Sequence, residues 1–130
     1  MSNDELRKQV ENASPHELVT MLYDKAVELC NGVLLRWDSP EEEDGGRLER
    51  CAEIIDELDR AIDANAPHRI SNNLRTLYGD IRQGLMSGMM RGKRNSLVRA
   101  RDSIAALRDA WKNAVNDKAG NDAGSMEPEA

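Results

Sequence analysis

The chain has 130 residues, enough for one domain with a buried core and too few for two independent domains. Apolar residues make up 39% of it, charged residues make up 32% and Phe is absent, a composition typical of amphipathic helices rather than of a β sandwich. The net charge of −6 argues against a general nucleic-acid binder.

The N-terminal part has neither a membrane span nor a leader pattern. No run approaches the roughly 18 apolar residues that cross a bilayer, and the segment from Met1 to Glu11 is too charged for a signal peptide. We therefore expect a cytoplasmic protein without membrane insertion. Cys30 and Cys51 have neither the density of a disulfide scaffold nor the spacing of a zinc site, so we expect reduced structural thiols.

The first helix is predicted to begin after Ser14. Ser14 and Glu17 form a capping box, with Pro15 at the first helical position. Apolar residues then recur at steps of three and four up to Trp37, as expected for a helix packed against others. These residues are Val19, Leu22, Ala26, Leu29 and Val33.

Three further apolar stripes predict three more helices. They lie over residues 48–62, 70–88 and 97–114. The second helix has two candidate starts, one after the Gly45–Gly46 pair and an earlier one at the Ser39–Pro40 pair. Both starts are compatible with the stripe.

Short connections favour antiparallel neighbours, so the predicted fold is all-α, an up-down-up-down four-helix bundle over residues 14–115. Residues 1–13 are predicted to form an N-terminal arm or lid, because Leu6 and Val10 provide one amphipathic turn. Residues 116–130 have no apolar stripe and are predicted to be a disordered tail.

Two loops of opposite charge are predicted to lie at one end of this bundle. The first is acidic over residues 41–44, and the second carries Arg91, Lys93 and Arg94, with Arg99 and Arg101 nearby. One interpretation is that the two loops neutralise each other, and the alternative is that the basic residues bind an anionic partner.

No arrangement of residues predicts catalysis, a metal site or a cofactor. His16 and His68 lie at helix starts without a nucleophile to activate, where solvated or capping roles are expected. No Glu-x-x-His spacing suggests a di-iron bundle, and no Gly-rich loop follows a strand. We therefore expect a protein-interaction module rather than an enzyme.

Two segments that contain the chain's only tyrosines resemble known signatures. SPHELVTMLYDKA, over residues 14–26, and ISNNLRTLYGDI, over residues 70–81, resemble the two signatures of the FliS family of flagellin-specific secretion chaperones. Their order and separation also fit. The similarity covers roughly residues 14 to 115.

This resemblance implies an antiparallel helical bundle that binds the C-terminal segment of flagellin in the cytoplasm. Such binding prevents premature polymerisation and delivers flagellin to the flagellar type III export gate. An alternative function is a helical adaptor or regulator that binds another flagellar or signalling protein. A third hypothesis is that the chain is a subunit of an enzyme.

The partner is expected to bind along the third helix, where a second apolar stripe widens the face and methionines extend it. Each tyrosine is expected to bury its ring and bring its hydroxyl to the surface at a groove edge. The alternative is a pair of ordinary bundle tyrosines with internal hydrogen bonds. The predicted partner-binding residues are Tyr23, Ile70, Asn73, Leu74, Leu77, Tyr78, Ile81, Leu85, Met86 and Met89.

Two glycines on the seam of the third helix need a packing reason, because glycine costs about 1 kcal/mol relative to alanine inside a helix. We expect the Trp37 indole to fill the space beside Gly84 and Gly88. Close approach by a partner helix is the alternative.

Overall fold

The computed structural model describes the backbone of residues 15–63 and 68–124, and the side chains of residues 16–61 and 73–114. Within these ranges the chain forms four helices and no strand, which confirms the all-α class. The predicted arm over residues 1–13 and the end of the tail, residues 125–130, lie outside the described residues.

Helix α2 (Pro15–Leu35) begins where the capping motif predicts. Proline suits the first turn, because the N–H that it lacks would have no acceptor within the helix there. The helix ends at Leu35 and the chain turns, with the N–H of Trp37 donating to the carbonyl of Leu34 at 3.2 Å.

Helix α3 (Asp44–Asp63) starts between the two predicted positions. The N–H of Glu41 donates to Asp44 Oδ2 at 3.0 Å, and the N–H of Asp44 donates to the carbonyl of Glu41 at 3.0 Å. This reciprocal pair closes the first turn as a capping box does. The two glycines of the pair Gly45–Gly46 therefore lie inside the helix instead of before it.

Helices α4 (His68–Arg91) and α5 (Arg94–Gly124) are joined by a two-residue turn. Gly92 has a φ of 63°, in the left-handed region where glycine carries no Cβ penalty. The N–H of Lys93 then donates to the carbonyl of Ser87 at 3.3 Å. The turn thus reverses the chain within very little space.

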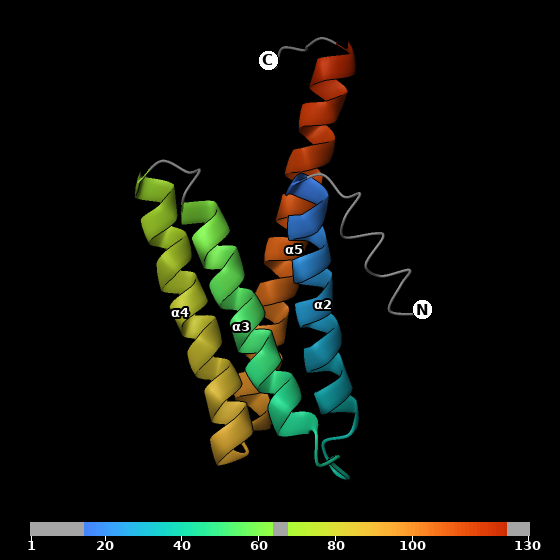
Figure 1. Cartoon of the computed structure of the whole chain (residues 1–130), viewed down its shortest axis with the longest axis vertical. Coiled ribbons are helices and arrows are strands. Elements are labelled where there is room, and N and C mark those ends of the chain that lie inside the picture. The colour runs from blue at the N-terminus through green and yellow to red at the C-terminus, as the bar shows by residue number, and fades with distance from the viewer. Residues whose placement is uncertain (1–14, 64–67, 125–130) are drawn as a thin grey trace.

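Helix α5 continues to Gly124, past Ala114 at the end of the predicted stripe, and its end projects past the other helices (Figure 1). The disordered tail over residues 116–130 stays a prediction. A helix closes its own main-chain hydrogen bonds, so it can continue beyond the last apolar position of the stripe.

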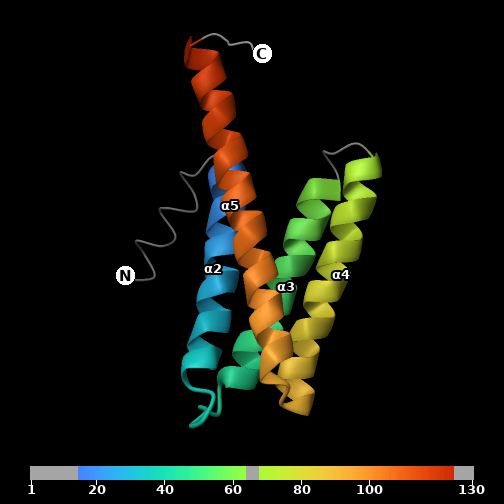
Figure 2. The ribbon, with the colours of Figure 1, turned by 180° about the vertical axis from the view of Figure 1, so that it is seen from behind.

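Each helix packs against two others: α2 against α3 and α5, and α4 against α3 and α5. Successive helices run in opposite directions, which gives the up-down-up-down bundle that the sequence predicts (Figures 1 and 2). Helices α2 and α4 are therefore diagonal partners across the centre. The two charged connections lie at the same end of the bundle, also as predicted.

The core is unevenly closed along the bundle axis. Residues in the middle and toward the two short connections, such as Cys51, Leu85 and Leu97, are at most 1% exposed. Toward the other end, the α2–α5 pair and the α3–α4 pair diverge in both views (Figures 1 and 2). Apolar residues there pack against the core yet remain partly exposed: Val19, Leu22, Leu74, Leu77, Leu107 and Trp111.

Candidate functional site

The two tyrosines lie in the core and bind each other. Tyr23 is 2% exposed, Tyr78 is fully buried, and their hydroxyl oxygens are 2.8 Å apart. Burial raises the pKa of both phenols. The expectation that the hydroxyls reach the surface is therefore wrong, and the alternative of an internal hydrogen bond is correct.

The diagonal position of α2 and α4 explains this pair. A side chain from either helix must cross the centre of the bundle to reach the other, and tyrosine is long enough to do so. Each hydroxyl then provides the polar partner that the other needs in an apolar interior. The residue spacing around each tyrosine does not show that the two side chains meet.

The other predicted binding residues fall into three groups. Ile81 and Leu85 are buried core residues. Asn73 and Met86 are exposed, and the side chain of Ile70 lies outside the described residues. Partly exposed positions complete the set: Leu74, Leu77 and Met89. Of the nine predicted residues whose side chains the structure describes, a partner can therefore reach five without repacking the core.

Gly84 and Gly88 allow α5 to approach α4 closely. A Cβ on Gly84 would lie 3.0 Å from both Ala100 Cβ and the Ser96 carbonyl oxygen, and a Cβ on Gly88 would lie 3.0 Å from Leu97 Cβ. The predicted role of Trp37 as the filling group at both glycines is thus wrong. The glycines serve the packing of α4 against α5.

Asp44, the last residue of the acidic loop over residues 41–44, is a buried carboxylate. It is 5% exposed, and its Oδ1 lies 2.7 Å from Arg36 Nη2 and 2.6 Å from Arg47 Nη1. The hydrogen bond from Arg36, with further help from the N–H of Glu41 and from Arg47, lowers the Asp44 pKa to about 2. The reciprocal hydrogen bond at the start of α3 places the carboxylate between the two guanidinium groups.

This network corrects the prediction that the two charged loops neutralise each other. Glu41 and Asp44 form their ion pairs with Arg36 and Arg47 of their own segment. The ion pairs of the described side chains include none between the acidic loop and the turn after α4. Pairing within the loop is favoured because residues close in sequence lose less chain entropy on meeting.

The two cysteines meet in the core between α2 and α3. Cys30 Sγ and Cys51 Sγ are 3.7 Å apart, and both residues are fully buried free thiols. The hydrogen bond to Cys30, together with burial, raises the pKa of Cys51. A raised thiol pKa disfavours the reactive thiolate, which supports the structural interpretation.

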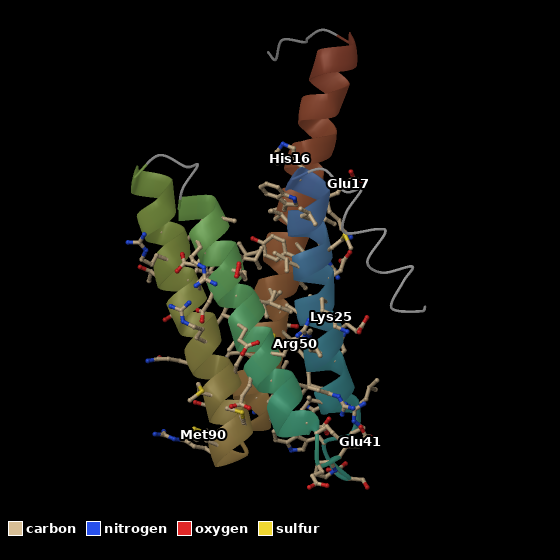
Figure 3. The ribbon with its side chains drawn as sticks, viewed as in Figure 1. His16, Glu17, Lys25, Glu41, Arg50 and Met90 are labelled. Carbon is tan, nitrogen blue, oxygen red and sulfur yellow. The ribbon has the colours of Figure 1, made fainter. Side chains whose placement is uncertain are left out.

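His16, at the start of α2, lies against α5. Its ring and that of Trp111 have centroids 5.4 Å apart, and Trp111 Nε1 donates to the His16 carbonyl at 3.1 Å (His16 is labelled in Figure 3). These contacts fix the beginning of α2 on α5. Among the described residues, no group of three or more His, Cys, Asp or Glu side chains is placed to hold a metal ion. None of the helices in the described part is long and apolar enough to cross a membrane.

Comparison with known families agrees with the bundle and with its two tyrosine segments. The model of one family, described as "Flagellar protein FliS", matches residues 1–118. The chain belongs to the FliS family. The match also covers the first 13 residues, which the resemblance in sequence left out. A comparison with curated proteins finds no match to this chain.

Membership of the FliS family assigns the chain a chaperone role in flagellar export. This role is one of protein binding rather than of catalysis, so the relevant features are surfaces that a protein partner can reach. Two parts of the described surface qualify by exposure: the diverging end of the bundle, and the end of α4 with its turn into α5.

Proposed function

We propose that this FliS-family protein binds the C-terminal segment of flagellin in the cytoplasm, prevents its premature polymerisation and delivers it to the flagellar export gate. The observation that carries this proposal is the partly open apolar core at the diverging end of the bundle. Family membership supports the class of partner, and the partly exposed apolar residues support the proposed place.

The diverging end offers apolar surface from three helices. Leu22 of α2, Leu74 and Leu77 of α4, and Leu107 and Trp111 of α5 are all partly exposed. Burying apolar area stabilises a complex by about 25 cal/mol per Å² before the ordering cost of the partner is subtracted. A flexible flagellin tail that lies over this end would therefore gain affinity by completing the core.

Asn73 supplies the polar part of the site. It is exposed on α4 directly beside Leu74, and its amide carries both a donor and an acceptor for the backbone of a bound segment. Met86 and Met89 extend the proposed contact along α4, where flexible thioether side chains adapt to varied partners. Tyr23, Tyr78, Ile81 and Leu85 support the site from the core.

Calorimetric titration with a peptide of the flagellin C-terminal segment tests the proposal. We expect the double variant Asn73→Ala, Leu74→Ser to bind at least about tenfold more weakly, because it loses an amide contact and an apolar contact. The matched control combines Gln83→Ala on the same helix with Leu35→Ser, which removes a leucine that is 86% exposed at the other end.

Circular dichroism must show that both double variants keep their helical content. Equal affinity in the two variants would reject the placement of the site at the diverging end. Absence of binding by the unaltered protein would reject flagellin as the partner and favour the adaptor alternative. Tyr78→Ala is unsuitable here, because it removes a fully buried ring.

A further inference from the structure

Basic side chains gather where α4 turns into α5. Six of the chain's 18 basic residues and none of its 24 acidic residues lie between positions 81 and 101. Four of the six are exposed, and we call them the basic turn: Arg91, Lys93, Arg94 and Arg99. The tight reversal at Gly92 brings the first three together, and Arg99 follows on the first turns of α5.

The cations of the basic turn form no ion pair with any side chain that the structure describes. The other two basic residues of the stretch differ, because Arg82 lies 3.0 Å from Asp56 and Arg101 lies 2.8 Å from Asp102. In the acidic loop at the same end, Glu41 and Asp44 pair with Arg36 and Arg47. A concentration of unpaired charge in a chain of opposite net charge attracts an acidic partner.

An apolar side chain lies beside the cations. Met90 is 71% exposed and directly precedes Arg91, and Figure 3 shows it at the end of α4, on the side away from Glu41. Arg99 adjoins a groove between α4 and α5 whose polar lining includes Ser87 and Ser96. The surface therefore combines positive charge, hydroxyl groups and one flexible apolar contact.

The acidic loop at the same end limits the shape of the partner. Asp38, Glu42 and Glu43 are exposed there, so a flat anionic membrane or a long nucleic acid facing this end would meet negative charge as well as the basic turn. A slim protein segment can contact the α4–α5 side alone. Met90 also favours a partner that carries apolar side chains.

We propose that the basic turn and Met90 form a second docking surface, which binds an acidic amphipathic segment of a partner protein. This surface begins beyond Met86 and Met89, at the opposite end of α4 from Leu74 and Leu77 of the diverging end. The chaperone would thus hold its cargo at one end and contact an acidic protein at the other.

The test uses a synthetic amphipathic helix with leucines along one face and glutamates on both sides of them. We expect this probe to bind the full chain with an affinity that falls as salt is raised. Arg91→Glu with Arg94→Glu should weaken binding at least about tenfold, because two attractive charges become repulsive. Met90→Ser should weaken it about threefold, and Leu35→Ser should leave it unchanged.

Lys25→Glu with Arg50→Glu is the matched control, since it changes the net charge equally on the α2–α3 side (Figure 3). We expect it to retain affinity for the probe within about twofold. Equal weakening in both double variants would overturn the proposal, because the attraction would then reflect net charge alone. A lysine version of the helix that binds as tightly would also overturn it.

Duplex DNA and anionic vesicles serve as competing probes. Tighter binding of either one than of the glutamate helix would overturn the choice of a protein partner. The flagellin peptide separates this proposal from the previous one: the variant with Arg91→Glu and Arg94→Glu should still bind it. Loss of both ligands in this folded variant would mean that the two surfaces are one site, and would reject the second docking surface.

Discussion

The α2–α3 hairpin and the α4–α5 hairpin each reverse the chain between two packed helices, but different interactions stabilise them. The first is closed by an eight-residue connection whose buried Asp44 is held by two arginines, and its helices meet through thiols. The second is closed by two residues, and its helices pack closely at Gly84 and Gly88, which have no side chain. The first hairpin uses its charges internally, whereas the second leaves its cations exposed.

This difference separates charged residues that stabilise the fold from charged residues that are available to bind a partner. Arg36 and Arg47 stabilise the fold, because removing either one takes an ion-pair partner from the buried Asp44 carboxylate. The cations of the basic turn have no such task among the described side chains. In the second hairpin, by contrast, the close contacts at Gly84 and Gly88 leave little space for an added side chain.

The largest expected effect comes from a substitution that disrupts the contact between Gly84 and α5. Gly84→Val should destabilise the protein by about 3 kcal/mol, because even its Cβ would lie 3.0 Å from a backbone oxygen of α5. Urea unfolding followed by circular dichroism measures this change. Gly79→Ala is the matched control on the same helix, since an added Cβ there comes only within 3.9 Å of the flexible end of Arg82.

The second prediction breaks the ion-pair network of the first hairpin. Asp44→Ala should lower the free energy of unfolding by about 2 kcal/mol, since two guanidinium groups and the N–H of Glu41 each lose one hydrogen-bond acceptor, the Asp44 carboxylate. Asp38→Asn, an exposed change in the same connection, should alter it by less than about 0.5 kcal/mol. Similar losses in both variants would contradict the special role of Asp44.

The same network predicts a pH dependence. Folding lowers the Asp44 pKa from 3.8 to about 2, so the unfolded chain takes up this proton first as the pH falls. The stability from Asp44 is therefore present above about pH 4 and is lost as the pH falls toward 2. Urea unfolding at several pH values should show this loss in the unaltered chain and a smaller loss in Asp44→Ala.

The fourth prediction concerns the tyrosine pair, which joins the two hairpins. Tyr78→Phe should cost about 1 kcal/mol, because it leaves the Tyr23 hydroxyl buried without its partner. The double variant with Tyr23→Phe should cost less than the sum of the two single changes, as a double-mutant cycle would show. Strict additivity would mean that the hydroxyl contact contributes nothing.

The smallest expected effect is a gain in stability, in contrast to the loss expected for Gly84→Val. Gly79→Ala should stabilise the protein by about 0.5 to 1 kcal/mol, because alanine is the better helix former and the position is uncrowded. Urea unfolding of this variant beside Gly84→Val then separates helix propensity from packing. A loss of stability in Gly79→Ala would contradict the interpretation that this position is uncrowded.

The sequence alone determined the four helices of the described part, most of their bounds, the antiparallel order and the resemblance to the FliS family. These features follow from local rules, because apolar spacing and the Ser14 to Glu17 cap act within one helix. The sequence also determined that two loops of opposite charge share an end. The start of α3 at Asp44, between the two predicted positions, is a shift along a correctly predicted helix.

Only the tertiary structure decided how side chains meet between helices. Tyr23 and Tyr78 are 55 residues apart, and nothing in the spacing around either one shows that their hydroxyls bind each other across the bundle. Residue spacing also does not show that Gly84 lies against Ala100, or that Asp44 pairs with Arg36 instead of with the basic turn. Periodicity fixes which face of a helix is buried, but the partner on that face depends on the relative rotation and separation of two helices, which are set by the packing of the whole core.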